Sequence, residues 1–202
     1  MSTLHETINA VCDDLNRTDL TAQASDAVVM AIRHFDRKRW WFSESSATFT
    51  TTSTTSTYPL ATDFRAMDYV EVRWPGDNWQ ELKSRDFGTV KRMLEGQTVT
   101  GYPEVYALRD SSLELAYQPN SEYLVRYYYL KALTDLTAEA SNSWTTDCKD
   151  LIRAHAARTV ALRTLHDVEL AQVLAAVEQE EYQRLIEEND RRTTIGKATP
   201  HY

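Results

Sequence analysis

The sequence has a β-rich middle between two stretches of helical periodicity, and this order restricts the chain to a mixed fold. Apolar residues recur at helical spacing over residues 4–15 and 24–35, and again over residues 148–162 and 170–177. Between these stretches lie short alternating segments bounded by Gly or Pro. We therefore predict an α+β protein, in which the N- and C-terminal helices form a helical bundle with an inserted antiparallel β-sheet domain and an extended C-terminal tail.

The domain boundaries are expected where the periodicity changes. A Thr/Ser run over residues 48–57 is rich in β-branched side chains, which favour strands, and it follows the second helical stretch. We assign residues 1–46 and 131–193 to the helical body and residues 47–130 to the β-rich insertion. Residues 194–202 have no periodicity, and we assign them to a C-terminal docking tail.

The N-terminal helices have recognisable start and stop signals. Thr3 and Glu6 form a capping-box pattern, which predicts the start of the first helix. A second helix is predicted over residues 21–39 and ends in the basic run of residues 37–39. Cations there complement the negative end of the helix dipole, and a nucleic-acid patch is the alternative interpretation.

The C-terminal helical stretches differ in charge. The first, over residues 148–163, carries Lys149, Arg153, Arg158 and Arg163, whereas the second, over residues 167–191, is rich in glutamate. A basic helix followed by an acidic one is most simply an αα-hairpin with complementary surfaces.

The middle of the chain is predicted to form a meander of short strands. Residues 69–74 and 79–82 alternate on either side of Pro75-Gly76-Asp77-Asn78, which predicts a hairpin. A short helix is expected over residues 84–95. The remaining strands are predicted at residues 104–108, 112–117 and 122–130.

Composition excludes several classes of protein. The 202 residues can bury a real core, and 22 Lys and Arg against 30 Asp and Glu give a formal net charge of -8. This charge disfavours tight, general binding to nucleic acid. No apolar run is long enough to cross a bilayer, and no secretory signal is recognisable, so we expect folding in a reducing cytoplasm and no membrane partner.

No arrangement of residues points to catalysis. His155 and His166 lie about three helical turns apart, whereas zinc ligands on one helix need a spacing near one turn. Cys148 lacks a nucleophile signature, and only 5 glycines are available for a phosphate cradle. We expect no enzyme activity, no metal and no cofactor. The alternative is a hydrolase whose carboxylate pair is too scattered to recognise, for which a cleft with perturbed acids would be the sign.

The order of several short motifs, spread over most of the chain, carries a resemblance to a known family. These motifs are Leu15-Asn16-Arg17, Trp40-Trp41-Phe42, Tyr58-Pro59-Leu60, the Gly101-Tyr102-Pro103 turn, the strand over residues 113–117 that ends near Pro119, Lys131-Ala132-Leu133 and the Ala/Leu-rich helical pair up to Arg192. In this order they resemble the head-to-tail adaptor (connector) proteins of short-tailed bacteriophages.

The resemblance implies a structural virion protein of the phage neck, made in the host cytoplasm and located between the capsid portal and the tail. Such adaptors form a ring, here expected to be a dodecamer, which docks on the portal protein after DNA packaging. The ring then provides the attachment platform for tail nozzle and fibre proteins. Another neck or tail component, such as a head-completion or tail-terminator protein, is the alternative.

The resemblance also suggests where portal docking and DNA passage take place. The C-terminal segment would reach the portal, with portal-docking residues Arg191, Arg192, Ile195, Gly196, Pro200 and Tyr202. Acidic side chains would line the lumen and let double-stranded DNA pass in transient contact, without sequence specificity. The candidates are Glu178, Glu180, Glu181, Glu187 and Glu188. A solvated helix face is the alternative for these glutamates, and a tail resting on its own subunit is the alternative for the docking segment.

Overall fold

The chain folds into two compact units. The computed structural model describes residues 2–53, 55–74, 76–95, 100–133, 137 and 139–194, with only the backbone described at residue 194. A helical unit comprises Met1–Ser43 and Leu133–Tyr202, and a β unit comprises Glu44–Ala132. The predicted α+β class is confirmed, because helices and mainly antiparallel sheets are both present.

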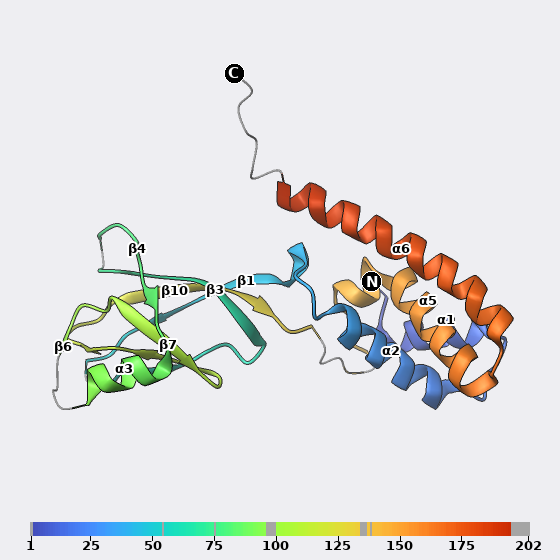
Figure 1. The fold of residues 1–202 in the computed structure, drawn as a ribbon, viewed down its shortest axis with the longest axis horizontal. Coiled ribbons are helices and arrows are strands. Elements are labelled where there is room, and N and C mark those ends of the chain that lie inside the picture. Colours follow the sequence, from blue (N-terminus) through green and yellow to red (C-terminus); the bar gives the residue numbers. More distant parts are fainter. Residues whose placement is uncertain are drawn as a thin grey trace, which may run out of the picture. The chain divides into compact units, whose positions relative to one another are not determined.

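In the helical unit, α5 is the central element. The helices are α1 (Leu4–Asp14), α2 (Thr21–Phe35), η1 (Trp41–Ser43), α4 (Ser143–Thr146), α5 (Lys149–Val160), η2 (Ala161–Leu165) and α6 (Val168–Thr194). Helix α5 packs against α1, α2 and α6, and α6 runs alongside it (Figure 1). The predicted capping box starts α1: the Glu6 N–H donates to Thr3 Oγ1 at 3.2 Å, and the Thr3 N–H donates to Glu6 Oε2 at 3.1 Å.

Helix α2 ends at Phe35, four residues before the predicted end at residue 39. Its C-cap is Asp36, which is 3% exposed. The carboxylate of Asp36 accepts hydrogen bonds from the Trp144 indole N–H at 3.0 Å and from the Leu133 backbone N–H at 3.3 Å. These contacts come from residues about a hundred positions away, so the local basic run could not reveal them.

The turn between α5 and α6 depends on His166. Helix α5 continues directly into the wider π-helical segment η2, and His166 then adopts a left-handed conformation with φ of 54°. The Asp167 side chain accepts a hydrogen bond from the Leu170 N–H at 2.9 Å, which caps the start of α6. His166 is therefore a turn residue between two helices that pack against each other.

Tryptophan and phenylalanine side chains form much of the helical core. Trp144 and Trp40 are 0% and 2% exposed, and their rings meet edge to face at a centroid distance of 5.9 Å. The Trp40 indole N–H donates to the Phe35 carbonyl at 2.8 Å. Both buried indoles therefore fill the core and have their polar atoms satisfied.

The β unit contains two four-stranded sheets, one two-stranded sheet and a short helix. The elements are β1 (Glu44–Thr50), β2 (Thr57–Pro59), β3 (Phe64–Arg73), β4 (Gln80–Glu81), β5 (Lys83–Ser84), α3 (Phe87–Leu94), β6 (Thr100–Gly101), β7 (Val105–Arg109), β8 (Ser112–Leu115), β9 (Gln118–Pro119) and β10 (Leu124–Lys131). The sheet orders are β1-β10-β3-β4, β2-β8-β7-β5 and β6-β9.

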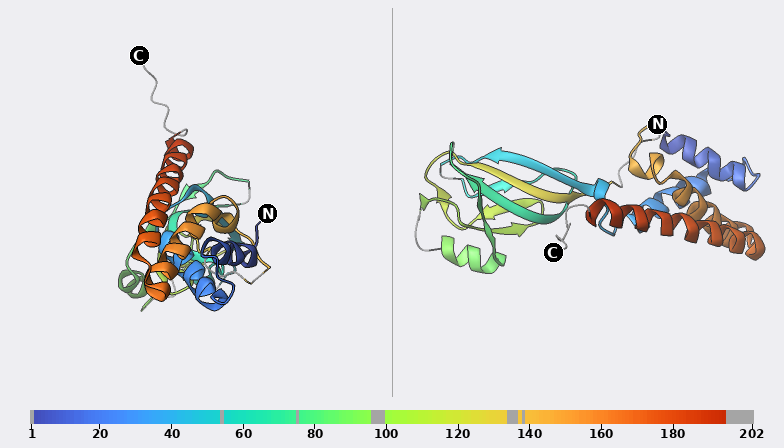
Figure 2. Two further views of the ribbon diagram at one scale, coloured as in Figure 1. Left: turned by 90° about the vertical axis from the view of Figure 1, so that its right-hand side faces the viewer. Right: turned by 90° about the horizontal axis from the view of Figure 1, so that it is seen from above.

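The predicted meander is wrong, although the β3–β4 hairpin forms as expected. Strand β10 pairs antiparallel with both β1 and β3, and the three strands lie side by side in Figure 2. The pairs β5–β7 and β6–β9 are parallel. Turn chemistry identifies hairpins between successive strands, but the sequence contains no comparable signal for pairs that join distant segments.

The two faces of β10 have different surroundings. Val125, Tyr127 and Tyr129 are buried in a core shared with Val70 and with side chains of β8. This alternation gives β10 one core face, in accord with the period of two of a β-strand.

Candidate functional site

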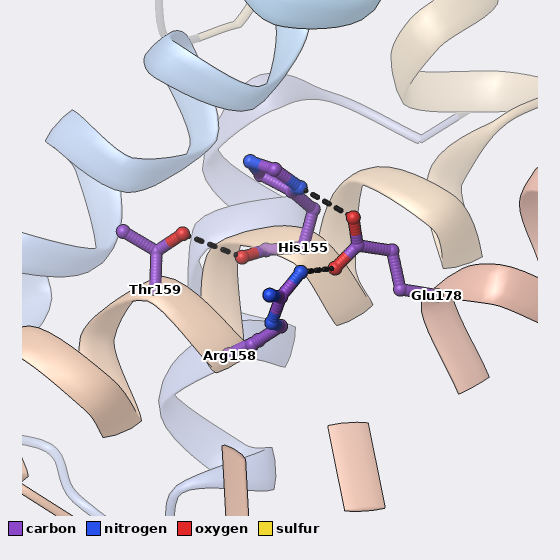
Figure 3. Close-up of polar contacts among 4 residues, drawn as sticks. All are labelled: His155, Arg158, Thr159 and Glu178. Carbon is purple, nitrogen blue, oxygen red and sulfur yellow. Dashed lines mark hydrogen bonds and ion pairs between the residues drawn. The ribbon is translucent and has the colours of Figure 1, made fainter. Parts of the chain in front are cut away.

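Three polar side chains from α5 and α6 meet inside the αα-hairpin (Figure 3). Glu178 of α6 lies between two residues of α5: His155 Nδ1 is 2.8 Å from its Oε1, and Arg158 Nη1 is 2.9 Å from its Oε2. Since an ionised carboxylate only accepts hydrogen bonds, His155 donates from Nδ1. The Thr159 hydroxyl donates to the His155 carbonyl at 2.9 Å. The cluster fixes the register of α6 on α5.

The Glu178 carboxylate is ionised in this environment. Burial raises its pKa. The hydrogen bonds from His155 and Arg158, together with their charges, lower it by a larger amount, so the net pKa is below the ordinary value of 4.5. The Glu178 side chain is 14% exposed. The structure therefore places this predicted lumen residue inside the hairpin, where its carboxylate is already bound by two side chains of its own chain.

We expect Glu178→Gln to destabilise the helical unit at neutral pH by about 1–3 kcal/mol, because it removes charge-assisted hydrogen bonds. The folded-state pKa of Glu178 is lowered, so the unfolded chain takes up this proton first as the pH falls. The contribution of Glu178 is thus fully present above pH about 4.5 and is lost below it. Thermal melts at several pH values should show a smaller acid-induced loss in the variant than in the wild type.

The matched control for this variant is Glu180→Gln, since the Glu180 side chain is 63% exposed and pairs only on the helix surface. We expect it to change the melting temperature little. Equal losses in the two variants would contradict a specific role for the buried cluster.

Beside this cluster, α2, α5 and η2 form a groove with a volume of about 460 Å³. The residues that line it are Met30, Arg33, His34, Arg37, His155, Arg158, Thr159, Leu162 and Arg163. We call it the basic groove. Within the described part of the chain, no carboxylate forms an ion pair with Arg33, Arg37 or Arg163. The groove therefore presents unneutralised cations on a protein whose formal net charge is -8.

The histidines of the basic groove are held close to its arginines. The His34 and His155 rings stack at a centroid distance of 5.3 Å. Burial, the neighbouring His155 and the charge of Arg37 together lower the pKa of His34 below 6.5, so the neutral imidazole is favoured. The positive charge of the groove near neutral pH thus comes mainly from its arginines.

The other predicted lumen residues lie on α6 outside the buried cluster. Glu180 and Glu181 both pair with Arg184, and Glu188 pairs with Arg192. Glu187 is exposed. The two residues of each pair are about one turn apart on a solvated helix, and such pairs contribute little to stability.

Part of the predicted docking segment lies beyond the described residues. Ile195, Gly196, Pro200 and Tyr202 are outside them, whereas Arg191 is exposed at the end of α6. The Arg192 guanidinium lies 4.5 Å from the centre of the Trp41 ring. Arg192 thus holds the end of α6 to η1 within the helical unit.

The open face of the sheet β1-β10-β3-β4 carries aromatic and charged side chains. Glu71 and Arg126 form an ion pair on this face, and the Arg126 guanidinium lies 4.1 Å from the centre of the Trp79 ring. Tyr69 and Tyr128 are directly opposite each other in the register and are 38% and 37% exposed. Such amphipathic rings are favoured at protein interfaces.

Two features bear on chemistry. Burial, with the charges of Asp147 and Glu188, raises the pKa of the Cys148 thiol to about 12, so the nucleophilic thiolate does not form near neutral pH. Among the residues that the structure describes, no three His, Cys, Asp or Glu side chains gather in a way that could hold a metal ion. The same residues contain no helix that is long and apolar enough to span a membrane.

The basic groove was not predicted from the sequence. Arg33 lies in the last turn of α2 and Arg37 lies two residues beyond its end; their spacing of four residues within the helix predicted over residues 21–39 was the available signal. Arg37 was instead assigned to the helix dipole, and the proximity of Arg163 depends on how α2 packs against α5 and η2.

A model of the family described as SU10 adaptor protein matches residues 2–200. No match was found among curated proteins.

Proposed function

The chain belongs to the family of phage head-to-tail adaptor proteins, and on this basis we propose that it forms a ring that docks on the portal after DNA packaging and carries the tail nozzle and fibres. Its family makes it a structural adaptor of the phage neck. The observation that carries the proposal is the extent of the match, residues 2–200, which includes both the helical unit and the β unit.

In this proposal each part of the chain has a different partner. The helical unit forms the ring, which we take to be a dodecamer. The tail, residues 194–202, docks on the portal together with Arg191 and Arg192. The β unit is the platform for nozzle or fibre proteins, and the exposed Tyr69 and Tyr128 on its open face support this role.

We test this function by electron microscopy of the purified protein, alone and mixed with its portal protein. We expect closed rings that attach to one end of the portal. A protein that stays monomeric in both samples would contradict the adaptor role. Rings that never associate with portal would contradict the docking role alone.

We also expect double-stranded DNA to pass through the ring without being held. An acidic lumen releases few counterions on contact with DNA, and Glu181, Glu187 and Glu188 are the candidates for its lining. A fluorescence-anisotropy titration with duplex DNA at physiological salt should show no binding at micromolar protein. Micromolar affinity there would count against this conduit.

A further inference from the structure

We infer that the basic groove of one copy receives an acidic and apolar stripe on α6 of a second copy. The groove combines charge with exposed apolar surface: Met30 and Leu162 are 47% and 46% exposed, and Arg33, Arg37 and Arg163 surround them. A surface of this kind is complementary to one that carries apolar side chains flanked by carboxylates.

Helix α6 carries such a surface. Val173 and Val177 are 64% and 43% exposed, and they are four residues apart on one helix face. Glu169 and Glu180, both exposed, continue the same face at either end. We call these four residues the α6 stripe. Exposed valines at helical spacing have no role in the core of their own chain, and they match the apolar part of the groove.

The groove and the α6 stripe lie on different sides of the helical unit. Val177 borders a hollow lined by Asp14 and Arg153, which places it on the side of α6 nearer α1. Glu178 and Tyr182 border another hollow with His34 and Lys38, on the side nearer α2. A contact between the groove of one copy and the stripe of the next is therefore heterologous, and repetition of such a contact closes into a ring when the rotation allows it. The inference rests on the proposed ring and names the surfaces that form it.

The test uses two charge-reversed proteins. One carries Arg33→Glu and Arg37→Glu in the groove, and the other carries Glu169→Arg and Glu180→Arg on the stripe. Each is expected to weaken subunit association roughly tenfold or more, measured as the dissociation constant from sedimentation or native mass spectrometry. The four side chains are exposed, so the melting temperature should stay close to that of the wild type.

A chain that carries all four reversals restores opposite charges across the contact, and we expect it to assemble again. The matched control is Lys91→Glu on α3, which changes an exposed cation of the β unit and should leave assembly unchanged. Wild-type rings together with groove variants that still assemble normally would overturn the inference but not the proposed function. Groove variants that assemble normally but lose portal or DNA binding would overturn the inference in the same way. Failure of the fourfold variant to reassemble would also overturn it, whereas a wild type without rings would contradict the proposed function itself.

Discussion

Trp144→Ala is expected to unfold the helical unit while the β unit stays folded. Trp144 is fully buried, and replacing a buried tryptophan with alanine costs about 3–5 kcal/mol. The change also removes an indole N–H from the Asp36 carboxylate, which is itself 3% exposed. A domain is stable by only about 5–15 kcal/mol, so this loss is a large part of the total.

Hydrogen exchange measured by mass spectrometry distinguishes the two units. We expect the amides of α2 and α5 to lose protection in the variant, and the amides of β3 and β10 to keep it, because the two units have separate cores. Trp41→Ala is the matched control. Trp41 is only partly buried and lies under Arg192, so its loss should cost less. Equal loss of protection in both units would contradict independent folding.

The helices were predictable because their signals are local. The capping box formed by Thr3 and Glu6 lies at the start of one helix, α1. Likewise, the apolar periodicity is contained within each of the helices α1, α2, α5 and α6. The end of α2 was not predictable, because Asp36 is satisfied by Trp144 and Leu133, which follow much later in the sequence. Local periodicity can place a helix, but a distant partner decides where it stops.

In the sheets, too, features with local signals were predictable and features that depend on distant residues were not. The β3–β4 hairpin follows from its turn residues, whereas the position of β10 between β1 and β3 requires long-range pairing. The same holds for the candidate functional residues. The sequence identified the acidic residues of α6 but not that His155 and Arg158 bind Glu178, since those contacts depend on the packing of α5 against α6.

Deleting residues 194–202 is expected to abolish co-purification with portal and to leave the melting of the helical unit unchanged. The segment lacks apolar periodicity, so it gains little by packing as a helix. Ordering it costs about 1–2 kcal/mol of backbone entropy per residue. Docking must offset this cost, and Ile195, Pro200 and Tyr202 are the sizeable apolar groups that can do so. Portal binding that survives the deletion would reject the docking role.

Substitutions at constant length show whether side-chain contact or chain length matters. Ile195→Ser, Pro200→Ser and Tyr202→Ser together remove the apolar groups, and we expect them to weaken portal binding as the deletion does. Lys197→Ser with Thr199→Ser is the matched control, which keeps those groups and should keep binding. If the tail instead rests on its own subunit, the deletion lowers the melting temperature of the isolated protein, because contacts within the folded chain are then lost. Melting and portal binding, measured on the same variants, therefore separate the two roles of the segment.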